Sequence, residues 1–149
     1  MSSERFDAAT AADGLMLVQF FATWCEPCVE EFPALDRLSR RFPGRPFTVV
    51  AINIGEPETR IRRFLDRVPV GFPVLLDPDK ATMKAWGVVG LPATFVLAPG
   101  FRPQHRVEGA IDWESPAVVA TIASALDAAA AQPRSVNPPE PINQKGRLP

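Results

Sequence analysis

The stretch FFATWCEPCVEEFP, residues 20–33, contains both cysteines of the chain, Cys25 and Cys28. It overlaps a short and almost wholly apolar run, residues 15–21, that predicts a buried strand. After the second cysteine, apolar residues recur at helical spacing, which predicts a helix from about Cys28 to Phe42. We therefore expect the two thiols between a strand and a helix, where open α/β sheets place their functional sites.

The pair of thiols could serve as metal ligands, as a structural staple or as a redox couple. A tetrahedral zinc site needs four ligands, and His105 is the only histidine, so no metal site is predicted. A disulfide between Cys25 and Cys28 would close a loop too small to stabilise the fold much. At a helix N-terminus, however, a thiolate is stabilised by free N–H groups and by the helix dipole. We predict that Cys25 attacks, that Cys28 resolves the mixed disulfide, and that Pro27 fixes the loop between them by preventing helix formation there.

The rest of the chain continues the alternation of strands and helices. Further strands are predicted over residues 46–55, 72–77, 91–100 and 104–111, and further helices over residues 56–68, 77–87 and 112–131. This order predicts an α/β fold with a mixed central sheet. The sheet should have a parallel core and an antiparallel edge pair, with helices on both of its faces.

Length and composition set the limits of the domain. The chain has 149 residues, is 46% hydrophobic and carries a net charge of −1, which suits one globular domain without affinity for nucleic acid. We predict an N-terminal segment over residues 1–14, a domain over residues 15–131 and a proline-rich, disordered tail over residues 132–149. No signal peptide or membrane span is recognisable, so the protein is either cytoplasmic or its export segment is absent from this chain.

Arginines cluster in the two helical segments at residues 37–45 and 60–67. The simpler interpretation is that both clusters are solvated helix faces. The alternative is that they form an electrostatic patch for a partner.

The motifs FFATWCEPC, EFP, VAINIGE and WGVVGLPATFVL occur in an order and spacing that resemble the thioredoxin superfamily. More narrowly, they resemble the extracytoplasmic thiol–disulfide oxidoreductases of the TlpA/ResA type. The resemblance covers roughly residues 15–130. It implies a thioredoxin fold, a cis peptide bond between Leu91 and Pro92, and a catalytic role for Pro92 facing the disulfide. Trp24, Pro27 and Leu91 would then help to form the substrate groove, with Trp24 as a lid.

The resemblance also implies partners and a location. It implies a monomer without a cofactor that acts on protein disulfides, such as those of an apocytochrome c or of an oxidase assembly factor. Electrons would come from a membrane or thioredoxin-type reductant. The location would be the periplasm or the cell envelope. The N-terminal β-hairpin that is common in the family does not fit into the residues before the first strand.

Glu31, one helical turn after Cys28, resembles a glutamate that ResA-type proteins place beside their cysteines. We expect it to tune the thiol pKa and to relay protons, and the alternative is an exposed surface glutamate. Gln19 stands where many thioredoxins have a buried carboxylate. Because negative charge near the thiols raises their pKa and disfavours the reduced form, the motif favours a reductase. Trp86 and Trp113 have only packing or surface positions in this interpretation.

Two alternatives remain open. A peroxidase of the peroxiredoxin type would use a related fold, but those enzymes share a Thr-x-x-Cys element, and Thr23 stands two residues before Cys25 rather than three. A non-catalytic module could bind Cu(I) through the two thiols, although methionines and histidines are missing near the motif.

Overall fold

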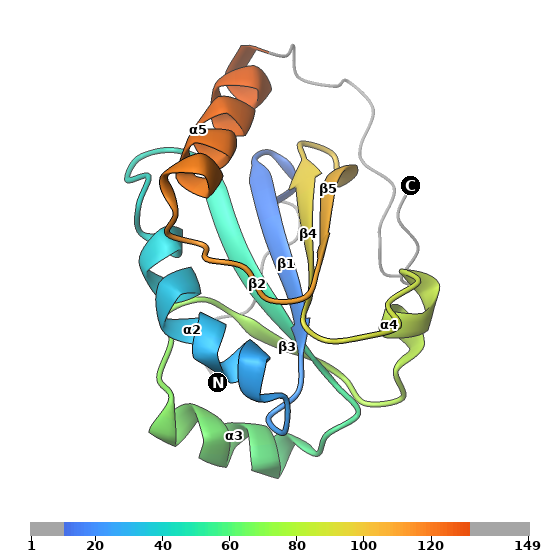
Figure 1. Ribbon diagram of the computed structural model, residues 1–149. Coiled ribbons are helices and arrows are strands. Elements are labelled where there is room, and N and C mark those ends of the chain that lie inside the picture. The colour runs from blue at the N-terminus through green and yellow to red at the C-terminus, as the bar shows by residue number, and fades with distance from the viewer. Residues whose placement is uncertain (1–10, 132–149) are drawn as a thin grey trace.

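The computed structural model describes residues 11–131, in which a five-stranded sheet with the order β3-β2-β1-β4-β5 is flanked by helices (Figure 1). The strands are β1 (Leu15–Phe21), β2 (Phe47–Ile54), β3 (Val74–Asp77), β4 (Ala93–Ala98) and β5 (Arg102–Glu108). The helices are α2 (Glu26–Ser39), α3 (Glu58–Arg67), α4 (Ala81–Ala85) and α5 (Pro116–Ala131). The predicted tail over residues 132–149 and most of the predicted N-terminal segment lie outside the described residues.

The sheet is mixed, as the alternation of elements predicted. β1 lies at its centre, parallel to β2 and antiparallel to β4, and all seven of its residues are buried. β3 extends the parallel part beside β2, and β5 forms the antiparallel edge beside β4. A strand buried on both sides needs no polar face, which explains why residues 15–21 are almost wholly apolar.

Ring contacts show that helices cover both faces of the sheet. Phe21 of β1 packs on Phe32 of α2 and Phe64 of α3, with ring centroids 4.7 and 6.0 Å apart. Phe20, the preceding residue of β1, points to the other face and packs on Trp86, which follows α4, at 5.4 Å. α2 and α3 therefore share one face, and the α4 segment covers the other.

The helix with the second cysteine begins earlier than its apolar pattern predicted. α2 starts at Glu26, so Pro27 lies in its first turn and does not keep the residues between the cysteines out of the helix, as we had expected. Proline is tolerated there because the N–H that it lacks would have no partner within the helix. The helix ends at Ser39 rather than Phe42, and the N–H of Arg40 bonds back to the carbonyl oxygen of Arg37.

The described chain begins to pack before the predicted domain boundary at residue 15. Ala11 and Ala12 are buried in the core, and the carbonyl of Ala12 accepts a hydrogen bond from the N–H of Gly100 at 2.8 Å. Within residues 11–131, no helix combines the length and the apolar character needed to cross a bilayer.

Candidate active site

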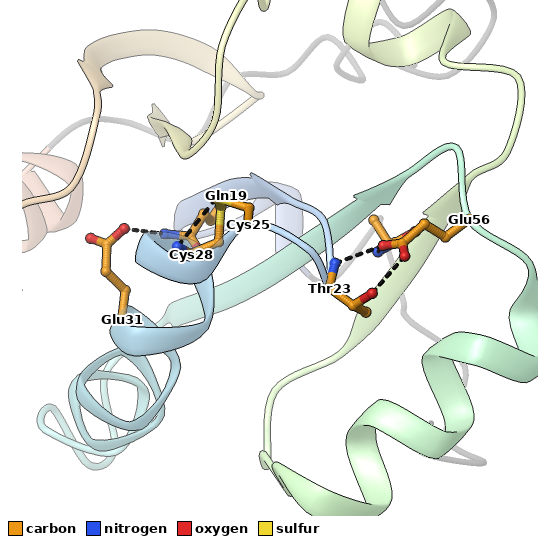
Figure 2. The surroundings of a disulfide bond; sticks show 7 residues. Gln19, Thr23, Cys25, Cys28, Glu31 and Glu56 are labelled. Carbon is orange, nitrogen blue, oxygen red and sulfur yellow. Dashed lines mark hydrogen bonds between the residues drawn. A yellow bond between two sulfur atoms is a disulfide. The ribbon is translucent and has the colours of Figure 1, made fainter.

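Cys25 and Cys28 form a disulfide at the start of α2, with their Cα atoms 5.3 Å apart (Figure 2). Cys25 is the N-cap residue of the helix, and its sulfur accepts a hydrogen bond from the N–H of Cys28 at 3.4 Å. Cys25 keeps 6% of its surface exposed, whereas Cys28 is fully buried. Cys25 is therefore the more accessible of the two cysteines, and it lies at the helix N-terminus that stabilises a thiolate.

Glu31 is a buried residue of α2, one turn beyond Cys28, and not a surface glutamate. Its carboxylate accepts hydrogen bonds from Gln19 Nε2 at 3.2 Å and from the backbone N–H of Ile111 at 3.3 Å. The indole N–H of Trp113 donates a third. Burial raises the pKa of Glu31 above its ordinary value, and the three hydrogen bonds only partly offset that rise.

Trp113 is the main component of the site that the sequence did not reveal. It is 2% exposed and holds Glu31 from the segment that precedes α5. Because the two residues are 82 positions apart, no local pattern links them. A packing or a surface position was expected for Trp113, without a role, and its hydrogen bond to the carboxylate was not predicted.

Gln19 connects the carboxylate to the centre of the sheet. It lies on β1 directly opposite Thr94 of β4, and both residues are fully buried. Gln19 Oε1 and Thr94 Oγ1 have no hydrogen-bond partner among residues 11–131. A polar pair therefore spans the two central strands on the face that α2 covers.

A second buried carboxylate, Glu56, holds the turn that leads into the cysteines. It accepts hydrogen bonds from the N–H and the hydroxyl of Thr23 at 2.7 and 2.5 Å, and from Asn53 Nδ2 at 2.9 Å. Figure 2 shows Glu56 and Glu31 on opposite sides of the cysteine turn. Burial opposes the ionisation of Glu56, but its hydrogen bonds and nearby Arg60 outweigh that effect and lower its pKa.

The peptide bond between Leu91 and Pro92 is cis, as the resemblance implied. Pro92 is buried and stands just before Ala93, which pairs with Phe20 near the end of β1. Leu91 is partly buried. The loop thus lies beside the strand end from which the cysteine turn starts.

Two large apolar side chains are exposed near these loops. Trp24, the residue before Cys25, is 69% exposed, and Val89 is 88% exposed. Trp24 was predicted as a groove residue, whereas Val89 was not singled out because it stands in a generally apolar segment. Trp24 is adjacent to Cys25 in the chain, so one exposed apolar side chain borders the disulfide.

Within residues 11–131, no three histidine, cysteine, aspartate or glutamate side chains are grouped so that they could hold a metal ion. His105 lies on the exposed edge strand β5.

Similarities to known proteins agree with the geometry of the cysteine site. The model of the AhpC/TSA family matches residues 2–101. The thiol-disulfide oxidoreductase ResA of Bacillus subtilis (strain 168) is 37% identical over 84 residues, which are 56% of this chain and 47% of that protein. The chain therefore spans about half the length of the curated relatives it matches.

Solved structures share the fold. A protein from Chlorobium tepidum, described as a thiol:disulfide interchange protein DsbE, is 27% identical with a TM-score of 0.68, over 80% of this chain and 82% of that one. StoA from Bacillus subtilis is 18% identical with a TM-score of 0.63, over 76% of this chain and 82% of its own. These similarities confirm the predicted thioredoxin fold and the resemblance to ResA.

Proposed function

The chain belongs to the AhpC/TSA family, and from that premise we propose that it is a thiol–disulfide oxidoreductase that reduces disulfides in protein substrates. The observation that carries the proposal is the placement of the two cysteines. One caps a helix and is partly accessible, and the other is buried a turn further on, near the buried carboxylate of Glu31.

The proposed reaction is a two-step exchange. The Cys25 thiolate attacks one sulfur of the substrate disulfide, which forms a mixed disulfide and releases the other substrate sulfur as a thiolate that takes up a proton. Cys28 then loses its proton and attacks the sulfur of Cys25, which releases the second substrate thiol. The substrate gains two electrons and two protons, and the protein ends as the Cys25–Cys28 disulfide.

In this scheme Glu31 receives the proton that Cys28 must lose before the second step. A carboxyl whose pKa is raised by burial exchanges protons closer to neutral pH than an exposed glutamate does. When ionised, Glu31 also raises the pKa of a thiol one turn away, because the two negative charges repel. The reduced form is then less favoured, and the protein gives up electrons more readily.

The groove for the substrate would be formed by the exposed side chain of Trp24, by Pro27 in the first turn of α2 and by the loop with Leu91 and Pro92. Exposed Val89 extends the same loop with apolar surface. An apolar rim suits a polypeptide segment that is unfolded around its disulfide.

The resemblance to ResA-type proteins supports finer proposals about the setting. We infer an extracytoplasmic location, with the cytoplasm as the alternative. The substrate would be an apocytochrome c or an oxidase assembly factor. The reductant would be a membrane protein or a thioredoxin. The protein would work as a monomer without a cofactor.

A single-turnover assay tests the proposed function. The protein is reduced, freed of excess reductant and mixed with an oxidised test protein that contains one disulfide. For each Cys25–Cys28 disulfide that forms, two substrate thiols should be released. Equilibration against thiol buffers should give a reduction potential below about −180 mV, on the reducing side of protein disulfide isomerase. A potential near −120 mV, typical of a strong oxidant, would instead indicate an oxidase.

Peroxidase activity is the alternative closest in chemistry, and the same sample tests it. The hydroxyl of Thr23 donates to Glu56 and is therefore already engaged. We expect slower consumption of hydrogen peroxide than of the disulfide substrate.

The other alternative is a module that binds Cu(I) without catalysis. Copper analysis of protein purified from copper-fed cells tests it, because such a module should hold one copper ion per pair of thiols.

A further inference from the structure

We propose that an arginine-lined groove beside the cysteine turn binds an acidic segment that flanks the disulfide of the protein substrate. The inference rests on the proposed function, because it names the class of substrate that the same site receives. The groove, which we call the α3 groove, has a volume of about 480 Å³ and is lined by Thr23, Pro57, Thr59, Arg60, Arg63 and Arg67.

The α3 groove is close to the reactive sulfur. Thr23 is part of its wall and precedes Cys25 by two residues, so their Cα atoms lie within about 7 Å of each other. Figure 1 shows α3 beside the turn that joins β1 to α2. A substrate whose cysteine reaches Cys25 could therefore place residues about three to six positions away in the groove.

The positive charge in the groove is only partly balanced within the protein. Arg60 lies 3.7 Å from the buried Glu56, and Arg62, which does not line the groove, pairs with Glu58 at 2.9 Å. Neither Arg63 nor Arg67 makes an ion pair within residues 11–131, and both are exposed. They stand four residues apart on one face of the helix, where like charges repel and an anionic partner relieves the repulsion.

The arginines of the other cluster differ from those of the α3 groove. Arg37, Arg40 and Arg45 each have a carboxylate partner, at 2.5, 2.7 and 2.7 Å, whereas exposed Arg41 makes no ion pair within residues 11–131. Arg67 lies in the last turn of α3 and gains from the helix dipole, but Arg63 lies too far from the helix end for that. Ion pairs within the protein therefore balance more of the charge in the first cluster than in the second.

The charge around the cysteines is also asymmetric. Glu26 and Glu30 are exposed at the start of α2, whereas the residues that line the α3 groove include three arginines and no carboxylate. An acidic segment would be repelled by Glu26 and Glu30 and attracted by the arginines of the α3 groove. The guanidinium groups can bind carboxylates through paired hydrogen bonds, which fixes the direction in which the segment crosses the site.

The experiment compares disulfide peptides that differ only in the residues flanking the cysteine. One set carries glutamates three to six positions before or after it, a second carries glutamines there, and a third carries lysines. The double variant Arg63→Gln/Arg67→Gln should lower kcat/KM for the better of the two glutamate peptides by about three- to tenfold, an effect that high salt removes. It should leave kcat/KM for the glutamine peptides unchanged. Arg62→Gln, on the same helix but outside the groove, should leave all rates unchanged.

A binding measurement separates this inference from the proposed function. A fluorescein-labelled, glutamate-rich peptide without cysteine should bind the oxidised wild-type protein and bind the double variant more weakly, even if no disulfide is ever reduced. Equal rates for the double variant and the wild type, or an equal fall with Arg62→Gln, would overturn the inference. Displacement of the labelled peptide by inorganic phosphate, but not by chloride of equal ionic strength, would also overturn it, because the groove would then be a small-anion site.

Discussion

The indole N–H of Trp113 donates a hydrogen bond to the carboxylate of Glu31 across 82 positions of sequence. This contact ties the helix that carries the cysteines to the segment before α5. The carboxylate is buried, so its charged form depends on the few donors that reach it. The properties of the proposed proton carrier are therefore set partly by a residue far from the cysteine motif.

Trp113→Phe keeps an aromatic ring but removes this donor. The pKa of Glu31 should rise further, because its charged form loses a hydrogen bond. The free energy of unfolding at neutral pH should fall by about 1–3 kcal/mol beyond the cost of the lost ring volume. Trp86→Phe is the matched control, because Trp86 is also buried but its indole N–H has no partner among the described residues. Urea unfolding checks the difference, and equal losses in the two variants would contradict the role of the hydrogen bond.

Glu31→Gln should change the thiol chemistry. Removing the charge should allow a thiolate to form at lower pH and should raise the reduction potential, and each 30 mV corresponds to about 1.4 kcal/mol for this two-electron couple. Thiolate absorbance against pH and equilibration with a thiol buffer measure the two quantities. Glu30→Gln, exposed and about 100° around the helix, is the control. If both variants shift the two quantities equally, Glu31 has no special role.

The buried carboxyl of Glu31 should also make the free energy of unfolding depend on pH. Its pKa in the folded protein is raised above the ordinary value of 4.5, so folding favours its protonated form. The stability that this provides is fully present below the unfolded pKa and is lost as the pH rises through the folded pKa. In the Glu31→Gln variant, the free energy of unfolding should not show this fall as the pH rises, because glutamine does not titrate. A parallel pH dependence in wild type and variant would show that the buried carboxyl does not titrate as described.

Glu56→Gln should loosen the turn before Cys25. The Glu56 carboxylate accepts three hydrogen bonds. Replacing it should lower the free energy of unfolding by about 1.5–3 kcal/mol at neutral pH. Because the pKa of Glu56 is lowered from 4.5, its contribution is present above the unfolded pKa and is lost as the pH falls through the folded pKa. The difference in the free energy of unfolding between wild type and Glu56→Gln should therefore disappear at acidic pH. Glu58→Gln, which removes only an exposed ion pair with Arg62, should cost less than about 1 kcal/mol at any pH.

Local patterns predicted most of the fold. β1 was recognisable because a strand that is buried on both faces is almost wholly apolar, and the alternation of strands and helices predicted the mixed sheet. The start of α2 was predicted too late because proline between the cysteines suggested a break, whereas proline is equally compatible with a first helical turn. Helix ends depend on such single positions, and the apolar stripe alone does not fix them.

Local patterns predicted the site only where its residues are close in sequence, whereas the cis bond before Pro92 was expected from the family resemblance. The spacing of Cys25, Cys28 and Glu31 follows the turn of one helix, so their proximity could be expected. The hydrogen bonds of Trp113 to Glu31 and of Thr23 to Glu56 depend on how distant segments meet, and tertiary packing decides that. The burial of Glu31 likewise became evident only from the segments that cover it.

In the proposed reaction, Cys25 attacks a substrate disulfide and Cys28 resolves the mixed disulfide. The most direct measurement is mass spectrometry of the Cys28→Ser and Cys25→Ser variants after each, in reduced form, meets a protein with a single disulfide. We predict that Cys28→Ser accumulates a covalent adduct linked through Cys25, and that Cys25→Ser, whose remaining thiol is buried, forms little or none. An adduct that forms mainly through Cys28, or no adduct with either variant while the wild type still releases substrate thiols, would show that Cys25 is not the attacking residue.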